Sequence, residues 1–290
     1  REGGLEARLV DLKRDVALIP RVAIHLNRET NSGVKYDPAR DLVALYAAGT
    51  GSGSFYREVA RTADCAPEDV VAGDLVLYNN QPGTVWGAEG EFVSAPRLDD
   101  LACVFACTEG FLTAQERDMV PVLCVFDNEE IGSETKQGAA SVFLPETLAA
   151  ISEALGLSAA DHRALLADSM MLSCDNGHAR HPNHPELADT NEAPVLNGGV
   201  VVKHSPRYAT DGVSAAVFTE LCRRAEVPVQ HYANRPDQMG GSTLGNIADT
   251  KLPIPTVDIG MAQLAMHSCF ETMGSRDVEA FVRAVRACYE

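Results

Sequence analysis

Residues 90–132 read GEFVSAPRLDDLACVFACTEGFLTAQERDMVPVLCVFDNEEIG, and this stretch decides the fold class of the chain. Within it, residues 101–115 have the apolar spacing of a helix, and residues 120–126 form an apolar run of the length expected for a buried strand. Further strands are expected at 170–173, 227–232 and 255–259. Strands that alternate with helices predict an α/β fold in which a mostly parallel sheet is covered by helices.

Three more helical regions are expected after this stretch. Residues 148–166 have the pattern of two helices that separate near Gly156, because glycine weakens a helix interior. Thr210 or Asp211 caps a helix that runs to about Ala225, and Ser275 caps the terminal helix. The predicted inner sides of these two helices are Val213, Ala216, Val217, Leu221 and Cys222 in the first, and Val278, Phe281, Val282, Val285 and Cys288 in the second.

The first ninety residues differ in pattern from the rest of the chain. Short apolar stretches are interrupted there by charged residues and proline, and residues 42–46 and 75–78 have the composition of strands. We therefore expect two domains, a β-rich domain over residues 1–90 and an α/β domain over residues 91–290.

Composition limits the kinds of function that this chain can have. It has 290 residues, of which 46% are hydrophobic, so it can bury a substantial core. Its formal net charge of −17 argues against a nucleic acid or an anionic membrane as a partner, and no apolar run approaches the roughly 20 residues that cross a bilayer. The eight cysteines have no CxxC spacing, which favours reduced thiols and a cytoplasmic protein.

Four short patches place metal ligands directly after apolar runs. They are Asp99 in SAPRLDD, Glu129 and Glu130 in VLCVFDNEEIG, Asp175 in MMLSCDNGHA, and His267 in LAMHSCFE. Ligands of α/β proteins gather at the carboxyl ends of strands, so we expect these patches to converge. Carboxylates and an imidazole that hold two divalent ions, with a spare carboxylate to activate water, form the residue set of a paired-metal hydrolase.

Glu129 and Glu130 are expected to have different roles. Neighbouring residues at a strand end point in opposite directions, so these two cannot easily bind the same ion, and one of them is free to reach a water molecule. The alternative interpretation is a turn with two solvated acids. For His267, which follows an apolar run, the alternative is a hydrogen-bonded core histidine.

Seven stretches share their motifs with one known family. They read IPRVAIHLNRE, GEFVSAPRLDDLA, VFDNEEIGS, SCDNGHARHPNH, VVKHSPRYATDG, GGSTLG and DIGMAQLAMHS. These stretches resemble the aspartyl aminopeptidases, zinc metallopeptidases with a catalytic α/β domain and an inserted β-rich domain. The resemblance implies that Asp99 bridges two divalent ions, which we expect to be zinc, that Asp175 binds one of them, and that Glu130 and His267 bind the other. It also implies that Glu129 is the general base.

The resemblance extends to the substrate and the assembly. An enzyme that removes an N-terminal Asp or Glu needs a cation beside that side chain, because a buried carboxylate without a partner is costly. Lys203 and His178 are the candidates for this cation, and Tyr208 is a further candidate for substrate binding. The resemblance assigns His25 to the active site of a neighbouring subunit, which implies a homo-oligomer that reaches the size of a dodecamer.

One motif of the family is missing from this sequence. The family completes one of its two metal sites, the one with Asp99 and Asp175, with a histidine in a His-x-Asp-Ser-Pro motif near its N-terminus. The 290 residues contain no such motif. We therefore expect the chain to lack the family's N-terminal segment. The metal site that contains Asp99 and Asp175 should then be one protein ligand short. Two hypotheses follow, a metal-dependent aminopeptidase and a catalytically inactive truncated homologue that retains a self-association role.

Overall fold

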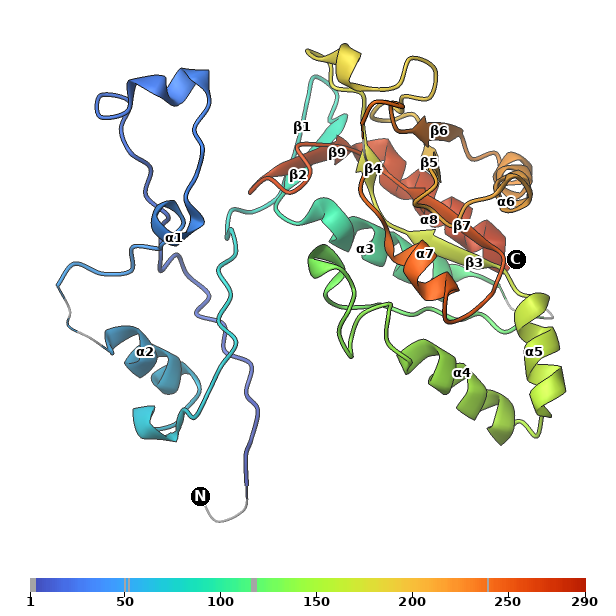
Figure 1. Cartoon of the computed structure of the whole chain (residues 1–290), viewed down its shortest axis with the longest axis horizontal. Coiled ribbons are helices and arrows are strands. Elements are labelled where there is room, and N and C mark those ends of the chain that lie inside the picture. Colours follow the sequence, from blue (N-terminus) through green and yellow to red (C-terminus); the bar gives the residue numbers. More distant parts are fainter. Residues whose placement is uncertain (1–3, 50, 52, 116–118, 239) are drawn as a thin grey trace. The chain divides into compact units, whose positions relative to one another are not determined.

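The computed structural model describes residues 4–49, 51, 53–115, 119–238 and 240–290 (Figure 1). The chain forms two compact units, Arg1–Asn80 and Gln81–Glu290, and each is considered by itself. Among the described residues, no helix is both long and apolar enough to pass through a membrane.

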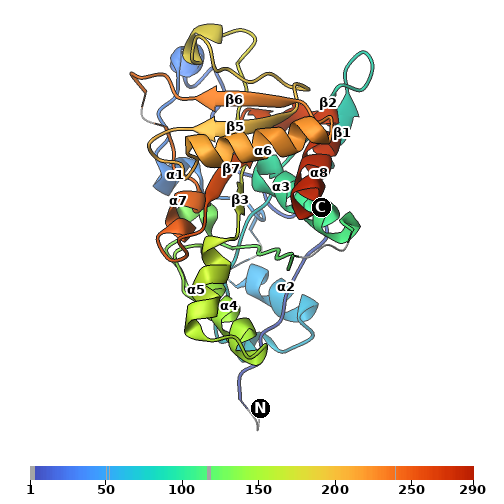
Figure 2. The same cartoon turned by 90° about the vertical axis from the view of Figure 1, so that its right-hand side faces the viewer.

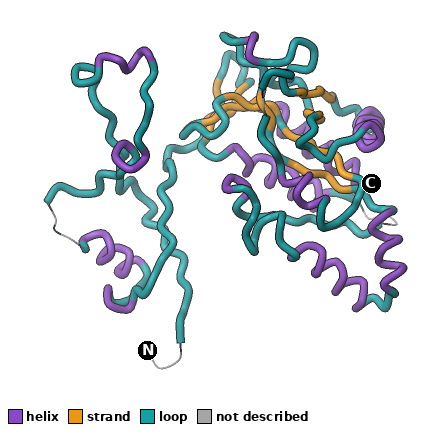
Figure 3. The backbone as a smooth tube through the Cα atoms, viewed as in Figure 1, coloured by secondary structure: helices purple, strands orange, loops and turns teal. Residues whose placement is uncertain are grey.

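Loops make up most of the first unit (Figure 3). Its regular elements are short: η1 (Arg28–Ser32), α1 (Pro38–Asp41), α2 (Ser54–Thr62) and η2 (Pro67–Asp69). The strands expected at 42–46 and 75–78 do not form: Leu45 makes one antiparallel bridge to Leu18, and Leu75, Val76 and Leu77 are exposed. A strand needs a neighbouring strand to complete its hydrogen bonds, and the described part of this unit supplies none.

The second unit is built on two sheets. The four-stranded sheet has the order β3-β7-β5-β6. Its strands are β3 (Met171–Cys174), β7 (Thr256–Gly260), β5 (Val200–His204) and β6 (Val229–Ala233). The β3–β7 and β5–β6 pairs are parallel and the β5–β7 pair is antiparallel, so the sheet is mostly parallel, as expected. The expected α/β class is thereby confirmed.

The five-stranded sheet continues two of these strands. Its order is β1 (Thr84–Trp86), β2 (Phe92–Ala95), β9 (Glu271–Gly274), β8 (Ala262–Leu264) and β4 (Gly177–His178). The chain passes from β3 to β4 and, beside it, from β7 to β8, and the amide of Asp175 donates to Ile259 O at 3.0 Å between them. Asp175 therefore lies at the junction of the two sheets.

Helices cover the two faces of the four-stranded sheet. The helices of this unit are α3 (Leu98–Thr113), α4 (Phe143–Ala154), α5 (Ala159–Ala167), α6 (Gly212–Arg224), α7 (Leu244–Asp249) and α8 (Ser275–Tyr289). Of these, α3, α6, α7 and α8 contact strands of the sheet, whereas α4 and α5 lie away from it (Figure 1). Side chains of α3, α6 and α8 share one apolar core with Val200 and Val202 of β5, and Figure 2 shows α6 running alongside β5 and β6. A Cβ on Gly110 of α3 would lie 2.8 Å from Val285 of α8, so only glycine permits this close helix contact.

Several helix predictions are confirmed and one helix face is corrected. The expected pair of helices over 148–166 forms as α4 and α5, and Asp211 caps α6 by accepting from the amides of Val213 and Ser214. The predicted inner side of α6 is wrong, because Val213 and Val217 are 73% and 44% exposed. The buried residues are Ser214, Ala215, Phe218 and Cys222, since burying the large ring of Phe218 removes more apolar surface from water.

The strand expected at 120–126 is also absent. Val120, Val122 and Val125 are exposed, and no described strand pairs with this segment. Without a paired neighbour its backbone cannot form a ladder, whatever its apolar composition. The segment leads instead into η3 (Glu129–Ile131), a single helical turn that carries both predicted glutamates. The remaining short element, η4 (Pro185–Leu187), follows the histidine-rich loop after β4.

Candidate metal centre

The second unit contains a cavity of about 480 Å³ that is lined by every predicted metal ligand. Asp99 comes from the start of α3, Asp175 from the turn after β3, and His267 from the loop after β8, while η3 supplies the two glutamates. The segments of Asp175 and His267 meet here because strands β3 and β7 run side by side and end at the same edge, and the pairing of β2 with β9 brings the segment of Asp99 to them.

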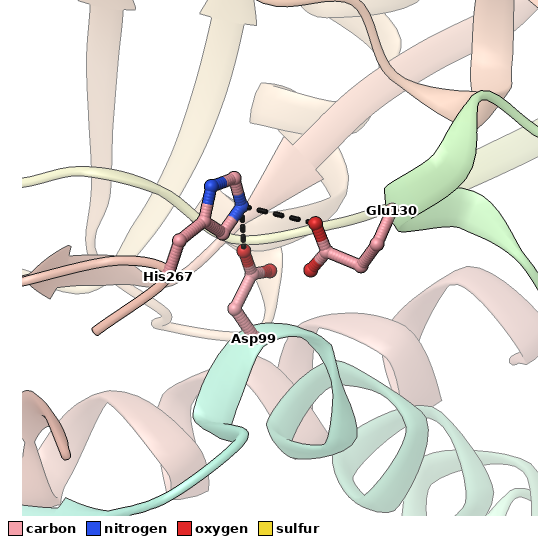
Figure 4. A group of neighbouring side chains, drawn as sticks. All are labelled: Asp99, Glu130 and His267. Atoms are coloured by element: carbon pink, nitrogen blue, oxygen red, sulfur yellow. Dashed lines mark ion pairs between the residues drawn. The ribbon is translucent and has the colours of Figure 1, made fainter. Parts of the chain in front are cut away.

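Asp99, Glu130 and His267 form the first ligand group (Figure 4). His267 Nε2 lies 3.2 Å from Asp99 Oδ2 and 3.1 Å from Glu130 Oε2. The side chain of Asp99 is 5% exposed, whereas those of Glu130 and His267 are 52% and 64% exposed. The ligand atoms of all three residues lie within 4.8 Å of one another, which one ion can span.

Asp99 also belongs to a second ligand group, with Asp100 and Asp175. Burial, together with the charges of Asp175 and Glu130, raises the pKa of Asp99 to about 8. Burial and the charge of Asp175 also raise the pKa of Asp100 well above its usual value. Sequence reasoning passed over Asp100, although it directly follows Asp99 in the LDD triplet.

These two groups fit divalent cations. Asp99 Oδ1 and Asp100 Oδ1 are buried and accept no hydrogen bond, so each has a lone pair without a partner. Carboxylate oxygens and an imidazole nitrogen are the donor set of zinc and of related divalent ions. Asp99, Glu130 and His267 would hold one ion, and Asp99 with Asp175, beside Asp100, would hold the other.

Glu129 lines the same cavity next to the first ligand group. Burial, with the charges of Asp175 and Glu130, raises the pKa of Glu129 to about 7. The left-handed backbone of Asn128, with φ of 61°, begins the turn that presents the two glutamates. The turn replaces the strand end that the sequence predicted. Both glutamates line the cavity, and Glu130 also contacts His267.

Lys203 lies beneath Asp175 and is 1% exposed. Its Nζ donates to Asp175 O at 2.7 Å, to Asp175 Oδ2 at 2.9 Å and to Asn176 O at 3.3 Å. Burial acts to lower the pKa of Lys203, but the carboxylate of Asp175 reverses this effect and raises it. Lys203 thus stays charged, and it holds a predicted metal ligand in place.

The other predicted substrate-binding residues of this unit surround Lys203 in the cavity. The ring of Tyr208 lies 5.4 Å from Lys203 Nζ, and the ring of His178 lies 6.4 Å from that of Tyr232. Burial and the charge of Lys203 lower the pKa of His178. Tyr232 was not predicted, but it pairs with Lys203 in the register of β5 and β6, which places it at the same edge.

His25 belongs to the first unit and is exposed. It is not among the residues that line the cavity. Its predicted role in the site of another subunit remains a prediction.

The comparisons with known proteins identify the family of the chain. The family model of the aminopeptidase I zinc metalloproteases (M18) matches residues 1–289. A probable M18 family aminopeptidase 2 of Mycobacterium leprae is 40% identical over 284 residues, which are 97% of this chain and 66% of that relative. The chain thus spans just under two thirds of the length of this relative.

Solved structures share the fold. A chain in the cryo-EM structure of the Ape4 and Nbr1 complex superposes with a TM-score of 0.91 at 30% identity, over 97% of this chain and 58% of that one. The dodecamer of mApe1 from Saccharomyces cerevisiae gives a TM-score of 0.80 at 29% identity, over 99% of this chain and 66% of that one. The match of the family model over nearly the whole length is decisive, and the chain belongs to the M18 family of zinc metalloproteases.

Proposed function

We propose that this protein is a metal-dependent aminopeptidase that hydrolyses the first peptide bond of its substrates. One observation carries the proposal: two ligand groups share Asp99, which lines one cavity, and Glu129 lines that cavity without belonging to either group. The membership of the chain in a zinc metalloprotease family supports the same assignment.

The residues of the cavity have separate tasks in this reaction. When bound, divalent ions supply Lewis acidity, which lowers the pKa of coordinated water and polarises the peptide carbonyl. Glu129 takes the proton of the attacking water and returns it to the leaving amine. Lys203 keeps the Asp175 carboxylate aimed at the site. The walls formed by Tyr208, Tyr232 and Thr243 limit the access of bulk water.

We also propose that the enzyme prefers an N-terminal Asp or Glu. The described lining of the cavity contains four carboxylates and Lys203 as its only lysine or arginine. An acidic side chain therefore needs to approach Lys203, and His178 and Tyr208 lie beside that route. A leucine side chain gains nothing from this cation.

The proposed enzyme assembles as a homo-oligomer. The exposed apolar side chains of the first unit, including Leu18, Leu26 and Val76, favour burial against another subunit. The dodecameric state of the yeast relative supports the same expectation, and His25 is our candidate for the residue that reaches a neighbouring site. Light scattering after size-exclusion chromatography measures the assembly, and a monomer at micromolar concentration would contradict it.

Hydrolysis of aminoacyl anilides tests the activity. We expect the protein loaded with zinc, manganese or cobalt to release aniline from the Asp and Glu substrates faster than from the Leu substrate. Glu129→Gln is the control, because it removes the base and leaves both ligand groups in place. No release with any of the three metals would support the inactive homologue with a self-association role instead. A parent that prefers Leu would refute only the acidic preference.

A further inference from the structure

One buried carboxylate contacts the backbone of two metal-ligand candidates at once. Glu271 lies at the start of β9 and is 2% exposed. Its Oε2 accepts from the amide of Asp99 at 2.9 Å, and its Oε1 accepts from the amide of His267 at 2.7 Å. Both of its oxygens are therefore used by the two residues whose side chains meet at 3.2 Å in the first ligand group.

The register of the five-stranded sheet explains how Glu271 reaches both segments. Ala95 of β2 pairs with Glu271, and Asp99 follows Ala95 by four residues. On the other side, His267 precedes Glu271 by four residues in the loop between β8 and β9. Glu271 thus lies between the two segments that carry ligands and accepts one backbone amide from each.

The backbone that Glu271 holds is not regular at either end. His267 has φ of 64°, a left-handed conformation that is unfavourable for a residue with a Cβ. Asp99 has φ of −87° and ψ of 113°, which lies outside helical geometry although the residue is at the start of α3. Neither amide can be satisfied by a regular ladder or helix, so the carboxylate stabilises both conformations.

We propose that Glu271 is a positioning residue that sets the separation between the Asp99 and His267 side chains and so determines the affinity of the first ligand group for a divalent ion. This inference rests on the proposed metal-dependent function. Charge-assisted hydrogen bonds to backbone amides are short and directional, which suits this task. Partners that orient metal ligands in this way typically contribute 10–100-fold, roughly, to metal affinity.

Asp277 of α8 provides a matched control. It is 1% exposed, and its two oxygens accept from the amides of Asn197 at 2.7 Å and Gly199 at 2.9 Å. Its chemistry and burial match those of Glu271, but neither Asp277 nor its partners line the cavity. Glu271→Gln and Asp277→Asn each remove one of two acceptor oxygens, so both perturb the fold and only the first perturbs the ligands.

Binding of Co²⁺ compares the two variants at a temperature at which circular dichroism shows both to be folded. We expect Glu271→Gln to weaken Co²⁺ binding by about 10–100-fold and to change the visible absorption of the bound ion. Asp277→Asn should keep the affinity and the spectrum of the parent. Parent-like binding by Glu271→Gln, or equal weakening in both variants, would overturn the proposal.

Hydrogen exchange of the metal-free protein gives a readout that does not depend on metal binding. We expect Glu271→Gln to accelerate exchange at the amides of Asp99 and His267, and Asp277→Asn to do so at Asn197 and Gly199. If the parent bound no Co²⁺, the proposed metal-dependent function would fail, while exchange would still test Glu271. Unchanged protection of both amides in Glu271→Gln would overturn its positioning role.

Discussion

The two ligand groups share Asp99 and differ in what balances their charge. In the first group an imidazole, His267, lies between Asp99 and Glu130, and the cavity leaves two of the three side chains more than half exposed. In the second group all three members are carboxylates, and the nearest cation is the buried Lys203, which contacts Asp175. Asp100 in this group has an oxygen without any hydrogen bond.

Because of this difference, the first group has the ligand set of a catalytic zinc site and the second group does not. The first group offers three ligands of two chemical types, which is the usual protein share of a catalytic zinc site. The second group brings three carboxylates together in a buried place, where burial and the charge of Asp175 raise the pKa of Asp99 and Asp100. We therefore expect the first group to bind its ion tightly and the second to bind an ion weakly.

Substituting the base should have the largest effect. Glu129→Gln should lower turnover by about 100-fold to 10,000-fold, the range attributed to a general acid–base, because an amide cannot take a proton from water. The metal content should not change, since Glu129 belongs to neither ligand group. Steady-state kinetics and elemental analysis of the same preparation measure both quantities.

Glu130→Gln is the companion to that experiment. Glu130 faces His267 at 3.1 Å in the first group, so its substitution should lower the metal content, and activity should recover in part when metal is added in excess. An exchange of the two phenotypes, with metal loss in Glu129→Gln, would reverse the roles of the neighbouring glutamates.

Removing the ammonium group of Lys203, which donates to Asp175 of the second group, should have the next largest effect. Lys203→Met leaves the Asp175 carboxylate without its buried partner, so we expect a loss of about 3–5 kcal/mol in the free energy of unfolding. The preference for Asp over Leu substrates should fall as well. Urea unfolding and competing anilide assays measure the two changes, and the exposed Lys251→Met is the control. A Lys203→Met variant with parent stability and an intact Asp preference would show that Lys203 neither stabilises the fold nor sets the substrate preference.

Asp277 is a buried carboxylate that belongs to neither ligand group. Burial raises the pKa of Asp277 to about 6, although two backbone amides donate to it. The folded protein therefore keeps this proton at pH values at which the unfolded chain, with a pKa of about 3.9, has lost it. Stability from this group is greatest below the unfolded pKa and is lost as the pH rises through about 6.

Unfolding experiments between pH 4 and pH 7, about the span of that titration, check this effect. Over this range the free energy of unfolding of the parent should fall by on the order of 2 kcal/mol relative to that of Asp277→Asn, because residue 277 titrates only in the parent. Parallel stability curves for the two proteins would show that the backbone donors fully offset the burial of Asp277.

The sequence pattern reached the four ligand candidates and Glu129 because each follows an apolar run, and such runs end at a shared edge in an α/β fold. Glu271 and Tyr232 could not be found in this way, since their roles depend on the registers Ala95 with Glu271 and Lys203 with Tyr232. The helices were predictable from local spacing and, for Asp211, from the cap. The expected cap at Ser275 is wrong, because Ser275 is the first residue of α8 and its hydroxyl donates to Gly90 O instead.

The predictions that failed concern segments whose structure depends on distant partners. Residues 120–126 and 75–78 have the composition of strands, but strand formation requires a neighbour that composition cannot supply. The inner face of α6 was misplaced because the competition between Val217 and Phe218 for the core is decided by packing. Local patterns thus predicted the helices and the residues that line the cavity, and they predicted strand pairing and packing poorly.

The zinc content of the 290-residue chain after exhaustive dialysis tests the central claim most directly. The account predicts about one tightly bound ion per chain, held by Asp99, Glu130 and His267, because this group combines two carboxylates with an imidazole, whereas the other group consists of carboxylates alone. His267→Ala should lose that ion. A parent that retains no zinc, or that retains two ions per chain, would contradict the difference between the two ligand groups on which the account depends.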